Sequence, residues 1–334
     1  TANYFRSLGI GKGDMVLVIL KRHYQFWFVA TALHKLGAVL VPATFMLTRH
    51  DVEYRINAAS IKAVVCTSQG DVAKAVEECE ADCPTLRCKI LVGEKWEGWH
   101  DYNTEVEQAS DTWERVQTNV HDPMLMYFSS GTSGYPKMVL HDHTYSIGHL
   151  LTAKHWHNID PDGLHFTIAD TGWGKAVWGK YYGQWMMESC VFTYDYDKFV
   201  PGDILSLIGK YHITSMCCPP TMFRFFLLEG VEKYDLSSLK YANIAGEALN
   251  PDVFHNWYEK TGIKLMEGFG QTETTLTVCN LKGMEPKPGS MGKPSPQFNI
   301  DIVDEEGNSC KPGETGEIVI HTEPRPEGLM MCYY

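Results

Sequence analysis

Residues 127–137 have the sequence Tyr127-Phe128-Ser129-Ser130-Gly131-Thr132-Ser133-Gly134-Tyr135-Pro136-Lys137, directly after an apolar segment that predicts a strand. The two glycines allow the backbone to approach a phosphate closely, and successive backbone N–H groups can bind an anion. Four Ser and Thr hydroxyls add hydrogen-bond donors, and Lys137 adds positive charge for a polyphosphate. The spacing differs from the Walker A pattern, and a flexible linker rarely begins at an apolar strand and ends in Pro-Lys. The pattern therefore predicts a phosphate-binding loop.

Short apolar segments alternate with helical patterns on both sides of this loop. Strands are expected at residues 15–20, 38–41, 63–67, 89–92, 124–129, 166–169, 190–194, 214–217, 241–245 and 264–267. The alternation predicts an α/β fold with two mostly parallel sheets and packed helices. Beyond residue 284, prolines and glycines break helices, which predicts a small C-terminal β subdomain. The expected boundaries are 1–118 for a first α/β subdomain, 119–285 for a second one with the ATP site, and 286–334 for the β subdomain.

Composition narrows the class of protein. The 334 residues are 44% hydrophobic, which is typical of a globular protein, and 29 basic against 41 acidic residues give a net charge of −12. This charge disfavours nonspecific nucleic-acid binding, and no apolar run approaches the roughly 18 residues of a membrane helix. We therefore expect no nucleic-acid partner and no integral membrane segment. The oligomeric state is left open.

The ten cysteines are dispersed through the chain and include no CxxC pair. Cys79, Cys83 and Cys88 form the nearest approach to a ligand cluster, but zinc sites favour tighter paired spacings. Reduced thiols and a cytoplasmic location are expected. The chain begins at Thr1, inside a helical pattern, and stops in an apolar run, so both ends are expected to be truncated. An upstream targeting segment therefore stays open.

Three segments together resemble the motifs of the adenylate-forming enzymes, the superfamily of acyl-CoA synthetases, adenylation domains and luciferases. The first is the phosphate loop. The second, Glu267-Gly268-Phe269-Gly270-Gln271-Thr272-Glu273, resembles the second core motif, and the third, Gly246-Glu247-Ala248, resembles the adenine-contacting segment. Residues 169–173 and 289–294 are similar to acetyl- and medium-chain acyl-CoA synthetases, and residues 138–143 and 194–197 are closest to the medium-chain branch.

The resemblance implies an ATP-dependent acid–thiol ligase. A medium-chain, branched or aromatic carboxylate attacks the α-phosphate of ATP to give acyl-AMP and pyrophosphate. The thiol of coenzyme A then displaces AMP to give acyl-CoA. ATP, Mg²⁺ and coenzyme A are implied, with a small carboxylic acid as the other substrate. Two alternatives remain: a carrier-loading adenylation domain, and a nucleotide- and acyl-adenylate-binding fragment without turnover.

The resemblance also implies roles for individual residues. Lys137, Thr272 and Glu273 are the expected catalytic residues, and the Glu273 carboxylate suits Mg²⁺, a hard ion that prefers oxygen ligands. Phe269 offers a flat face for adenine. The full expected ATP-binding set is Ser129, Ser130, Gly131, Thr132, Ser133, Gly134, Lys137, Gly246, Glu247, Ala248, Glu267, Gly268, Phe269, Gly270, Gln271 and Thr272.

The acyl pocket is expected where a Gly-rich segment begins a helix. Its expected members are Trp173, Gly174, Lys175, Val177, Trp178 and Gly270. Ordinary helix packing is the alternative for Trp178. Acetate-using relatives carry tryptophan at the position of Gly270, so a glycine there is expected to leave open space for a longer acyl chain. His141 and His143 form an isolated HxH pair, for which ordinary hydrogen-bonded histidines are a better interpretation than a metal site.

Full-length members of the superfamily continue beyond this point with a ribose-binding Asp, a hinge and a mobile domain of roughly 100 residues. The resemblance places the catalytic lysine and part of the coenzyme A site in that domain. These 334 residues are therefore expected to be weakly active by themselves.

Overall fold

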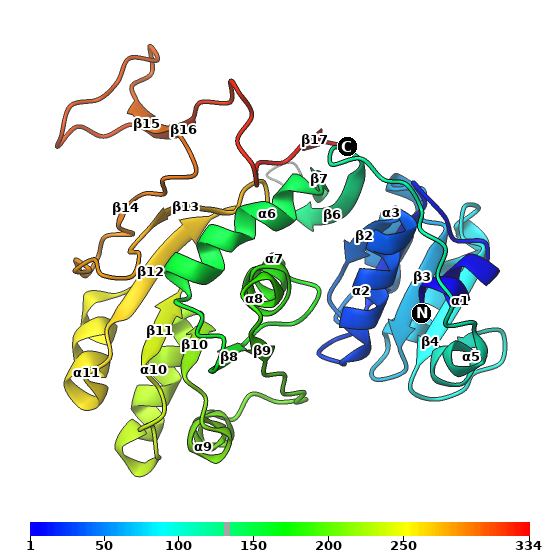
Figure 1. The fold of residues 1–334 in the computed structure, drawn as a ribbon, viewed down its shortest axis with the longest axis horizontal. Helices are drawn as coiled ribbons and strands as arrows, with labels where there is room; N and C mark the ends of the chain where they lie inside the picture. The colour runs from blue at the N-terminus through cyan, green and yellow to red at the C-terminus, as the bar shows by residue number, and fades with distance from the viewer. Residues whose placement is uncertain (130–133) are drawn as a thin grey trace.

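The computed structural model describes residues 1–129 and 134–334, which form two large sheets and a small hairpin (Figure 1). The first sheet has the order β17-β7-β6-β2-β1-β3-β4-β5. Its strands are β1 (Met15–Ile19), β2 (Val39–Pro42), β3 (Ala63–Thr67), β4 (Cys88–Val92), β5 (His100–Asp101), β6 (Pro123–Ser129), β7 (Lys137–Asp142) and β17 (Cys332–Tyr333). The strands from β1 to β6 are parallel where they pair, whereas β7 is antiparallel to β6 and β17 is antiparallel to β7.

Helices cover both faces of this sheet because its central strands are apolar on both sides. The helices of this half are α1 (Ala2–Ser7), α2 (Gln25–Leu36), α3 (Arg49–Ala58), α4 (Val72–Cys79), η1 (Glu80–Asp82) and α5 (Tyr102–Gln108). One core joins the sheet to α1 and α2, and the other joins it to α3 and α4. Thr48 and Asp51 form a reciprocal capping box that starts α3, and Gly37 ends α2 in the left-handed conformation.

The second sheet has the order β14-β13-β12-β11-β10-β8-β9. Its strands are β8 (Leu164–Thr167), β9 (Cys190–Val191), β10 (Ser215–Cys218), β11 (Tyr241–Ile244), β12 (Leu265–Gly270), β13 (Leu276–Cys279) and β14 (Lys293–Pro294). Three helices, each begun by a proline in its first turn, share an apolar core with this sheet: α9 (Pro201–Tyr211), α10 (Pro220–Glu229) and α11 (Pro251–Thr261). A short 3₁₀ turn, η3 (Val231–Lys233), follows α10.

Four helical segments run between the sheets in Figure 1: α6 (Thr144–Leu151), the π-helical turn η2 (Thr152–Trp156), α7 (Gly174–Lys180) and α8 (Tyr182–Met186). The core on the α2 face of the first sheet includes residues of these segments, so they connect the two halves. The predicted α/β class with two mostly parallel sheets is therefore confirmed. The small antiparallel pair β15 (Ile300–Val303) and β16 (Glu317–Ile320) lies within the residues expected to form the β subdomain.

The strand pairing differs from the expected grouping in two respects. The strands β14 and β17 fall within the expected β subdomain, yet they pair with β13 of the second sheet and β7 of the first sheet. The strands β6 and β7 follow residue 118, which was expected to end the first subdomain, yet they belong to the first sheet. Residues 137–142 also form a strand where the sequence predicted none, and β6 and β7 make a hairpin whose connecting residues are those of the phosphate loop. The subdomain boundaries themselves stay a prediction, because sheet pairing alone does not define independent folding units.

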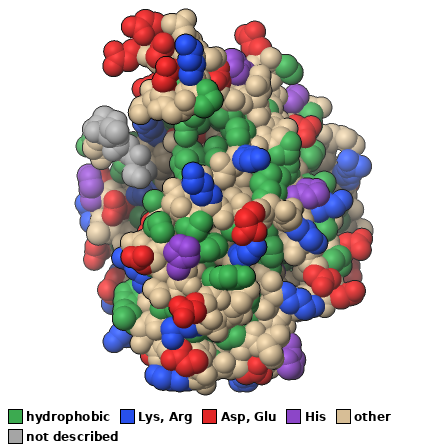
Figure 2. Space-filling view, turned by 90° about the vertical axis from the view of Figure 1, so that its left-hand side faces the viewer, with side chains coloured by type: hydrophobic (Ala, Val, Ile, Leu, Met, Phe, Trp, Pro, Cys, Tyr) green, Lys and Arg blue, Asp and Glu red, His purple; other side chains and the backbone are tan. Residues whose placement is uncertain are grey.

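The surface mixes charges of both signs. In the face drawn in Figure 2, acidic side chains gather at the top of the view, the end at which Figure 1 places β15 and β16. Over the rest of that face, basic and acidic side chains are scattered among hydrophobic and other surface. Among the described residues, no helix combines the length and apolar character needed to cross a membrane.

Candidate functional site

The strands β6 and β7 form a hairpin on either side of the phosphate loop. Ser129 and Lys137 pair directly across the two antiparallel strands, so the loop connects them at one end of the sheet. Lys137 is exposed there, and Gly134 has a φ of 97°, which a side chain would disfavour. The expected phosphate-contacting residues Ser130, Gly131, Thr132 and Ser133 lie outside the described residues.

A turn after β12 carries Thr272 and Glu273 and is held from two sides. The His141 Nε2 atom of β7 lies 2.8 Å from the Thr272 carbonyl oxygen, and the Met330 backbone N–H donates to the Glu273 carbonyl at 2.8 Å. Inside the turn, the Thr274 hydroxyl accepts from the backbone N–H of Gln271 at 3.0 Å. The backbone that presents Thr272 and Glu273 is therefore fixed against the hairpin of the other sheet.

Tyr333 joins the two charged residues that the sequence predicts at the phosphate site. Its hydroxyl donates to Glu273 Oε1 at 2.8 Å, and the Lys137 ammonium lies 5.2 Å from the centre of its ring. The hydrogen bond to Glu273, followed by partial burial, raises the pKa of Tyr333, so the hydroxyl stays protonated and donates. The structure thus gathers Lys137, Glu273 and Tyr333 at one place, although they are far apart in the sequence.

The donor set around Glu273 fits a magnesium ion held jointly with a nucleotide. One carboxylate is available, and Mg²⁺ commonly binds through one or two carboxylates together with substrate phosphates. In the described part of the chain, no three His, Cys, Asp or Glu side chains gather as a metal site. A magnesium ion here would therefore need phosphate oxygens beside Glu273.

The segment Gly246–Ala248 is exposed at the carboxyl end of β11. Gly246 has a φ of 101°, and the Lys175 ammonium donates to the neighbouring carbonyl of Ala245. The Glu247 carboxylate accepts from the Thr221 hydroxyl at 2.6 Å. Because the carboxyl ends of parallel strands are where α/β sheets bind ligands, this segment lies in a suitable place for an adenine.

Glu267 contacts the residues that follow Gly246–Ala248. Its side chain is buried, and its Oε1 atom accepts from the Leu249 backbone N–H at 3.3 Å. Burial raises the pKa of Glu267, against the smaller opposing effect of the Leu249 hydrogen bond. We infer that Glu267 stabilises the loop that carries Gly246–Ala248, which is a less direct role than the predicted contact with ATP.

The end of β12 is packed more tightly than expected. The register with β13 shifts between Phe269 and Gly270, which forms an irregularity of the bulge type. A Cβ atom at Gly270 would overlap both the Trp178 ring and the Thr275 carbonyl oxygen. The expectation that Gly270 leaves open space is therefore wrong: the indole of Trp178 fills it. The expected proximity of Gly270 and Trp178 is nevertheless found.

The other residues expected at the acyl pocket differ in how deeply they are buried. Trp173 is 57% exposed at the start of α7, whereas Val177 is fully buried in the core between the halves. Lys175, between them, reaches the end of β11 as described above. Trp178 is buried, and its Nε1 atom donates to the Tyr145 hydroxyl at 3.0 Å. The structure therefore brings Lys175, Trp178 and Gly270 toward the ends of β11 and β12.

The sequence did not indicate Tyr145 or Tyr333, and it left His141 outside the expected set of site residues. Each of the three contacts an expected site residue from more than 30 positions away in the chain. The available signal was the HxH pair, which suggested ordinary hydrogen-bonded histidines. His141 has one such bond, through Nε2, while its Nδ1 atom is buried without a partner among the described residues.

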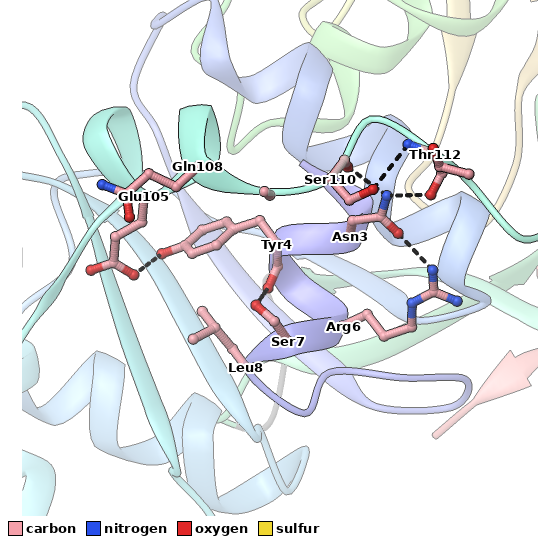
Figure 3. A pocket seen from close by; sticks show the side chains of 10 residues that line it. Asn3, Tyr4, Arg6, Ser7, Leu8, Glu105, Gln108, Ser110 and Thr112 are labelled. Atoms are coloured by element: carbon pink, nitrogen blue, oxygen red, sulfur yellow. Dashed lines mark hydrogen bonds between the residues drawn. The ribbon is translucent and has the colours of Figure 1, made fainter.

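Two surface pockets lie elsewhere. The larger, of about 720 Å³, lies between α1, α5 and residues 109–112 (Figure 3). In it, the Tyr4 hydroxyl donates to Glu105 and the Asn3 amide donates to the carbonyls of Ser110 and Thr112. The second pocket, of about 520 Å³, lies between α3 and α4. Neither pocket is lined by a residue expected at the ATP or acyl site.

Comparisons with known proteins agree with the fold and the motifs. A family model described as AMP-binding enzyme matches residues 1–334. The human protein named acyl-coenzyme A synthetase ACSM3, mitochondrial, is 39% identical over 330 residues, which are 98% of this chain and 56% of that protein. Its human relative ACSM5 is 36% identical over 330 residues, with the same coverage. The chain thus spans about half the length of the curated relatives it matches.

Solved structures match the whole chain. The crystal structure of Brucella canis acyl-CoA synthetase has a TM-score of 0.90 at 24% identity and covers 100% of this chain and 61% of its own. The anthranilate CoA ligase AuaEII, in complex with anthranoyl-AMP, has a TM-score of 0.89 at 26% identity and covers 100% of this chain and 64% of its own.

Proposed function

This chain belongs to the family of AMP-binding enzymes, and from that premise we propose that it forms the nucleotide- and acyl-binding part of an ATP-dependent acid–CoA ligase. One observation supports this most directly. The turn that carries Thr272 and Glu273 is fixed to β7, whose first residue is Lys137, and Tyr333 contacts both Lys137 and Glu273. The Lys137 ammonium, the Tyr333 hydroxyl and the Glu273 carboxylate thus lie together at the end of the β6–β7 hairpin that adjoins the phosphate loop.

The proposed first step is adenylation. A carboxylate oxygen of the acid attacks the α-phosphorus of ATP, a new O–P bond forms, and the bond to the bridging oxygen of pyrophosphate breaks. Both reactants are anions, so the site must neutralise charge and align them. Lys137 suits the outer phosphates and the Thr272 hydroxyl suits an α-phosphate oxygen. Mg²⁺ bound with Glu273 would offset further phosphate charge.

The proposed second step is thioester formation. The sulfur of coenzyme A attacks the acyl carbon of the adenylate, the bond from that carbon to the AMP oxygen breaks, and AMP leaves. The thiol proton passes to solvent. The adenine would lie against Phe269 and the exposed edge of Gly246–Ala248 throughout, which keeps the α-phosphorus in place for both steps.

The proposed acid is of medium length, branched or aromatic. Two observations support this: the matched relatives are acyl-CoA synthetases, and a neighbour of the same fold is named an anthranilate CoA ligase. Open space beside Gly270 does not support it, because the Trp178 indole fills that space. An indole wall suits flat or branched acids through aromatic and apolar contact. The cytoplasmic location stays a prediction, since the names of the relatives include the word mitochondrial.

Pyrophosphate release tests the proposal. We expect release that depends on both MgATP and an added carboxylate, with the highest rates between butanoate and octanoate or with benzoate, and low rates with acetate. Free acyl-CoA as the product separates a CoA ligase from a carrier-loading adenylation domain. The test uses the longest form of the protein that contains this chain. If that form binds ATP but releases no pyrophosphate with any acid, the proposal is contradicted.

We also propose that residues 1–334 alone are weakly active. The matched human relative is much longer than this chain. The resemblance to adenylate-forming enzymes places a catalytic lysine beyond the matched part, and one missing electrostatic donor costs about 10²–10³ in rate. Equal rates from residues 1–334 and from a longer form would contradict this.

A further inference from the structure

We propose that His141 and Tyr145 are positioning residues that tie the acyl pocket to the α-phosphate site through one closed circuit of contacts. The inference rests on the proposed function, because it assigns Thr272 and Trp178 to the two halves of the reacting pair. Neither His141 nor Tyr145 is expected to touch the substrate.

The circuit begins at the carbonyl of Thr272. His141 is fully buried on β7, and its Nε2 atom lies 2.8 Å from that oxygen. Because a carbonyl oxygen only accepts, Nε2 must carry the ring proton and donate. Burial lowers the pKa of His141 to about 4, against the opposing effect of the Thr272 hydrogen bond. The ring is therefore neutral near neutral pH, and a single tautomer holds the turn.

The circuit continues through Tyr145 on α6. Its ring centre lies 3.9 Å from that of His141, with 31° between the planes, so the two rings are in direct contact. Tyr145 is buried, and its hydroxyl accepts a hydrogen bond from Trp178 Nε1 at 3.0 Å. An indole N–H that is buried usually has such a partner, since leaving it unpaired costs roughly 1–3 kcal/mol.

The circuit closes on β12. The Trp178 ring fills the space directly over Gly270, which lies two residues before Thr272 in the chain. The path from Thr272 through His141, Tyr145 and Trp178 therefore returns to the same segment. A shift of Trp178 would be transmitted to the backbone at Gly270, and a shift of His141 would be transmitted to the backbone at Thr272.

This arrangement has a consequence for adenylation. The carboxylate must meet the α-phosphorus at close range, and a misplacement of about 1 Å can cost about 100-fold in rate. Trp178 would bound the acyl chain and Thr272 would contact the phosphate. A rigid connection between them sets the distance between the two reacting groups, whichever acid is bound.

Two neutral replacements of His141 test the first half of the circuit. In His141→Gln the amide nitrogen lies near the position of Nε2, whereas in His141→Asn it lies near Nδ1 and falls short of Thr272. Both lose the imidazole packing, so both should lose thermal stability to a similar extent. We expect the kcat for pyrophosphate release to be about tenfold or more lower in His141→Asn than in His141→Gln. Equal kcat values in two folded variants would overturn the role of His141.

Removal of one hydroxyl tests the second half. In Tyr145→Phe the ring contact with His141 remains, and only the partner of the Trp178 indole is lost. We expect the KM for the acid to rise at least about threefold and the ranking of acids by chain length to flatten, with the KM for ATP unchanged. Tyr182→Phe is the matched control, since its buried hydroxyl contacts His34 at 2.9 Å and not Trp178. An unchanged ranking in Tyr145→Phe would overturn the role of Tyr145.

The wild-type protein separates this inference from the proposed function. If the folded wild type releases no pyrophosphate with any acid, the proposed function fails. If the wild type is active and the two tests above give no difference, the proposed function stands and the positioning circuit fails.

Discussion

At the scale of single residues, Tyr333 contacts both Glu273 and Lys137, so a change in one of these three side chains should affect the other two. The tyrosine hydroxyl occupies one oxygen of Glu273, and its ring faces the lysine ammonium. A bound nucleotide with Mg²⁺ would compete for both groups, since phosphate binds the lysine and the metal binds the carboxylate. These three side chains are therefore the ones in which single replacements should report on nucleotide binding.

Replacement of Glu273 by Gln should impair the response to magnesium. The amide keeps the shape of the side chain but removes the charge that Mg²⁺ prefers. We expect the Mg²⁺ concentration for half-maximal pyrophosphate release to rise at least about tenfold. Loss of a residue that only orients a metal ligand already costs about 10- to 100-fold in metal affinity, so loss of a direct ligand should cost no less. Glu285→Gln, which breaks a surface pair with Lys264, is the control. A changed ranking of acids with an unchanged Mg²⁺ requirement would instead place Glu273 at the acyl pocket.

Replacement of Lys137 by Ala should weaken ATP binding without unfolding the protein. Lys137 is exposed, and its described contact is the face of Tyr333, so little packing is lost. A charge-assisted contact with phosphate is worth roughly 1.5–3 kcal/mol, which is about 10- to 150-fold in affinity. Titration of ATP against both forms, with melting temperature as the folding check, measures this. Unchanged ATP affinity and adenylation rate would remove Lys137 from the site.

At the scale of elements, the sequence identifies the loop and the turn but not what holds them together. The motif residues are local in sequence, so the phosphate loop, the Thr272–Glu273 pair and the Gly246–Ala248 segment can be predicted from the sequence alone. The strand β7 is missed because its end is polar: His141 and Asp142 are both buried. The Thr272 carbonyl, which bonds His141, and Arg325, which pairs with Asp142, are more than 100 residues away and cannot be inferred from local pattern. Asp142 also has nearer partners in Thr144 and His121.

The same limit explains the error at Gly270. A glycine in a sequence indicates that no side chain is present, but it does not say what fills the space. Here Trp178, from α7, fills it. The side chain that sets the size of the pocket at this point is therefore on a different element from the one the motif suggested.

Residue 270 should consequently be sensitive to any side chain. In Gly270→Ala the new methyl would overlap the Trp178 ring and the Thr275 carbonyl, and overpacking of this kind costs roughly 1–3 kcal/mol. Gly174→Ala, where a Cβ meets nothing within 4 Å, is the control and should be neutral or stabilising. Chemical denaturation compares the two. We expect Gly270→Trp to lose stability and activity toward all acids while Trp178 is present, and a selective shift toward acetate would contradict this.

At the scale of the whole molecule, four buried histidines lie in or beside the segments that connect the two halves. His141 on β7, His149 on α6, His157 directly after η2 and His165 on β8 are each no more than 1% exposed. Both ring nitrogens of His149 have no hydrogen-bond partner among the described residues, and its ring packs against Tyr145, Trp178 and Tyr182. The region that holds the site in place is therefore also one in which a positive charge is unfavourable.

This region should make the protein sensitive to mild acid. Burial lowers the pKa of all four histidines, to about 4 for His141 and about 3 for His157. In the unfolded chain they titrate near 6.5, so below that pH the unfolded state binds more protons than the folded state. The stability is thus complete above pH 6.5 and is lost as the pH falls from 6.5 toward 4. Each histidine contributes at most about 1.4 kcal/mol per pH unit in this window.

The variant His149→Phe isolates one of these protons. The ring size and the packing against Tyr145 and Tyr182 are nearly kept, and the two unpartnered nitrogens are removed. The free energy of unfolding, measured in urea at pH 7 and at pH 5, should fall less steeply with acid in the variant than in the wild type. The expected difference is up to about 1.4 kcal/mol per pH unit, the effect of one proton. If the two proteins lose the same stability between these pH values, the His149 ring is already accessible to protons in the folded state, and the interface between the halves must open more readily than its packing indicates.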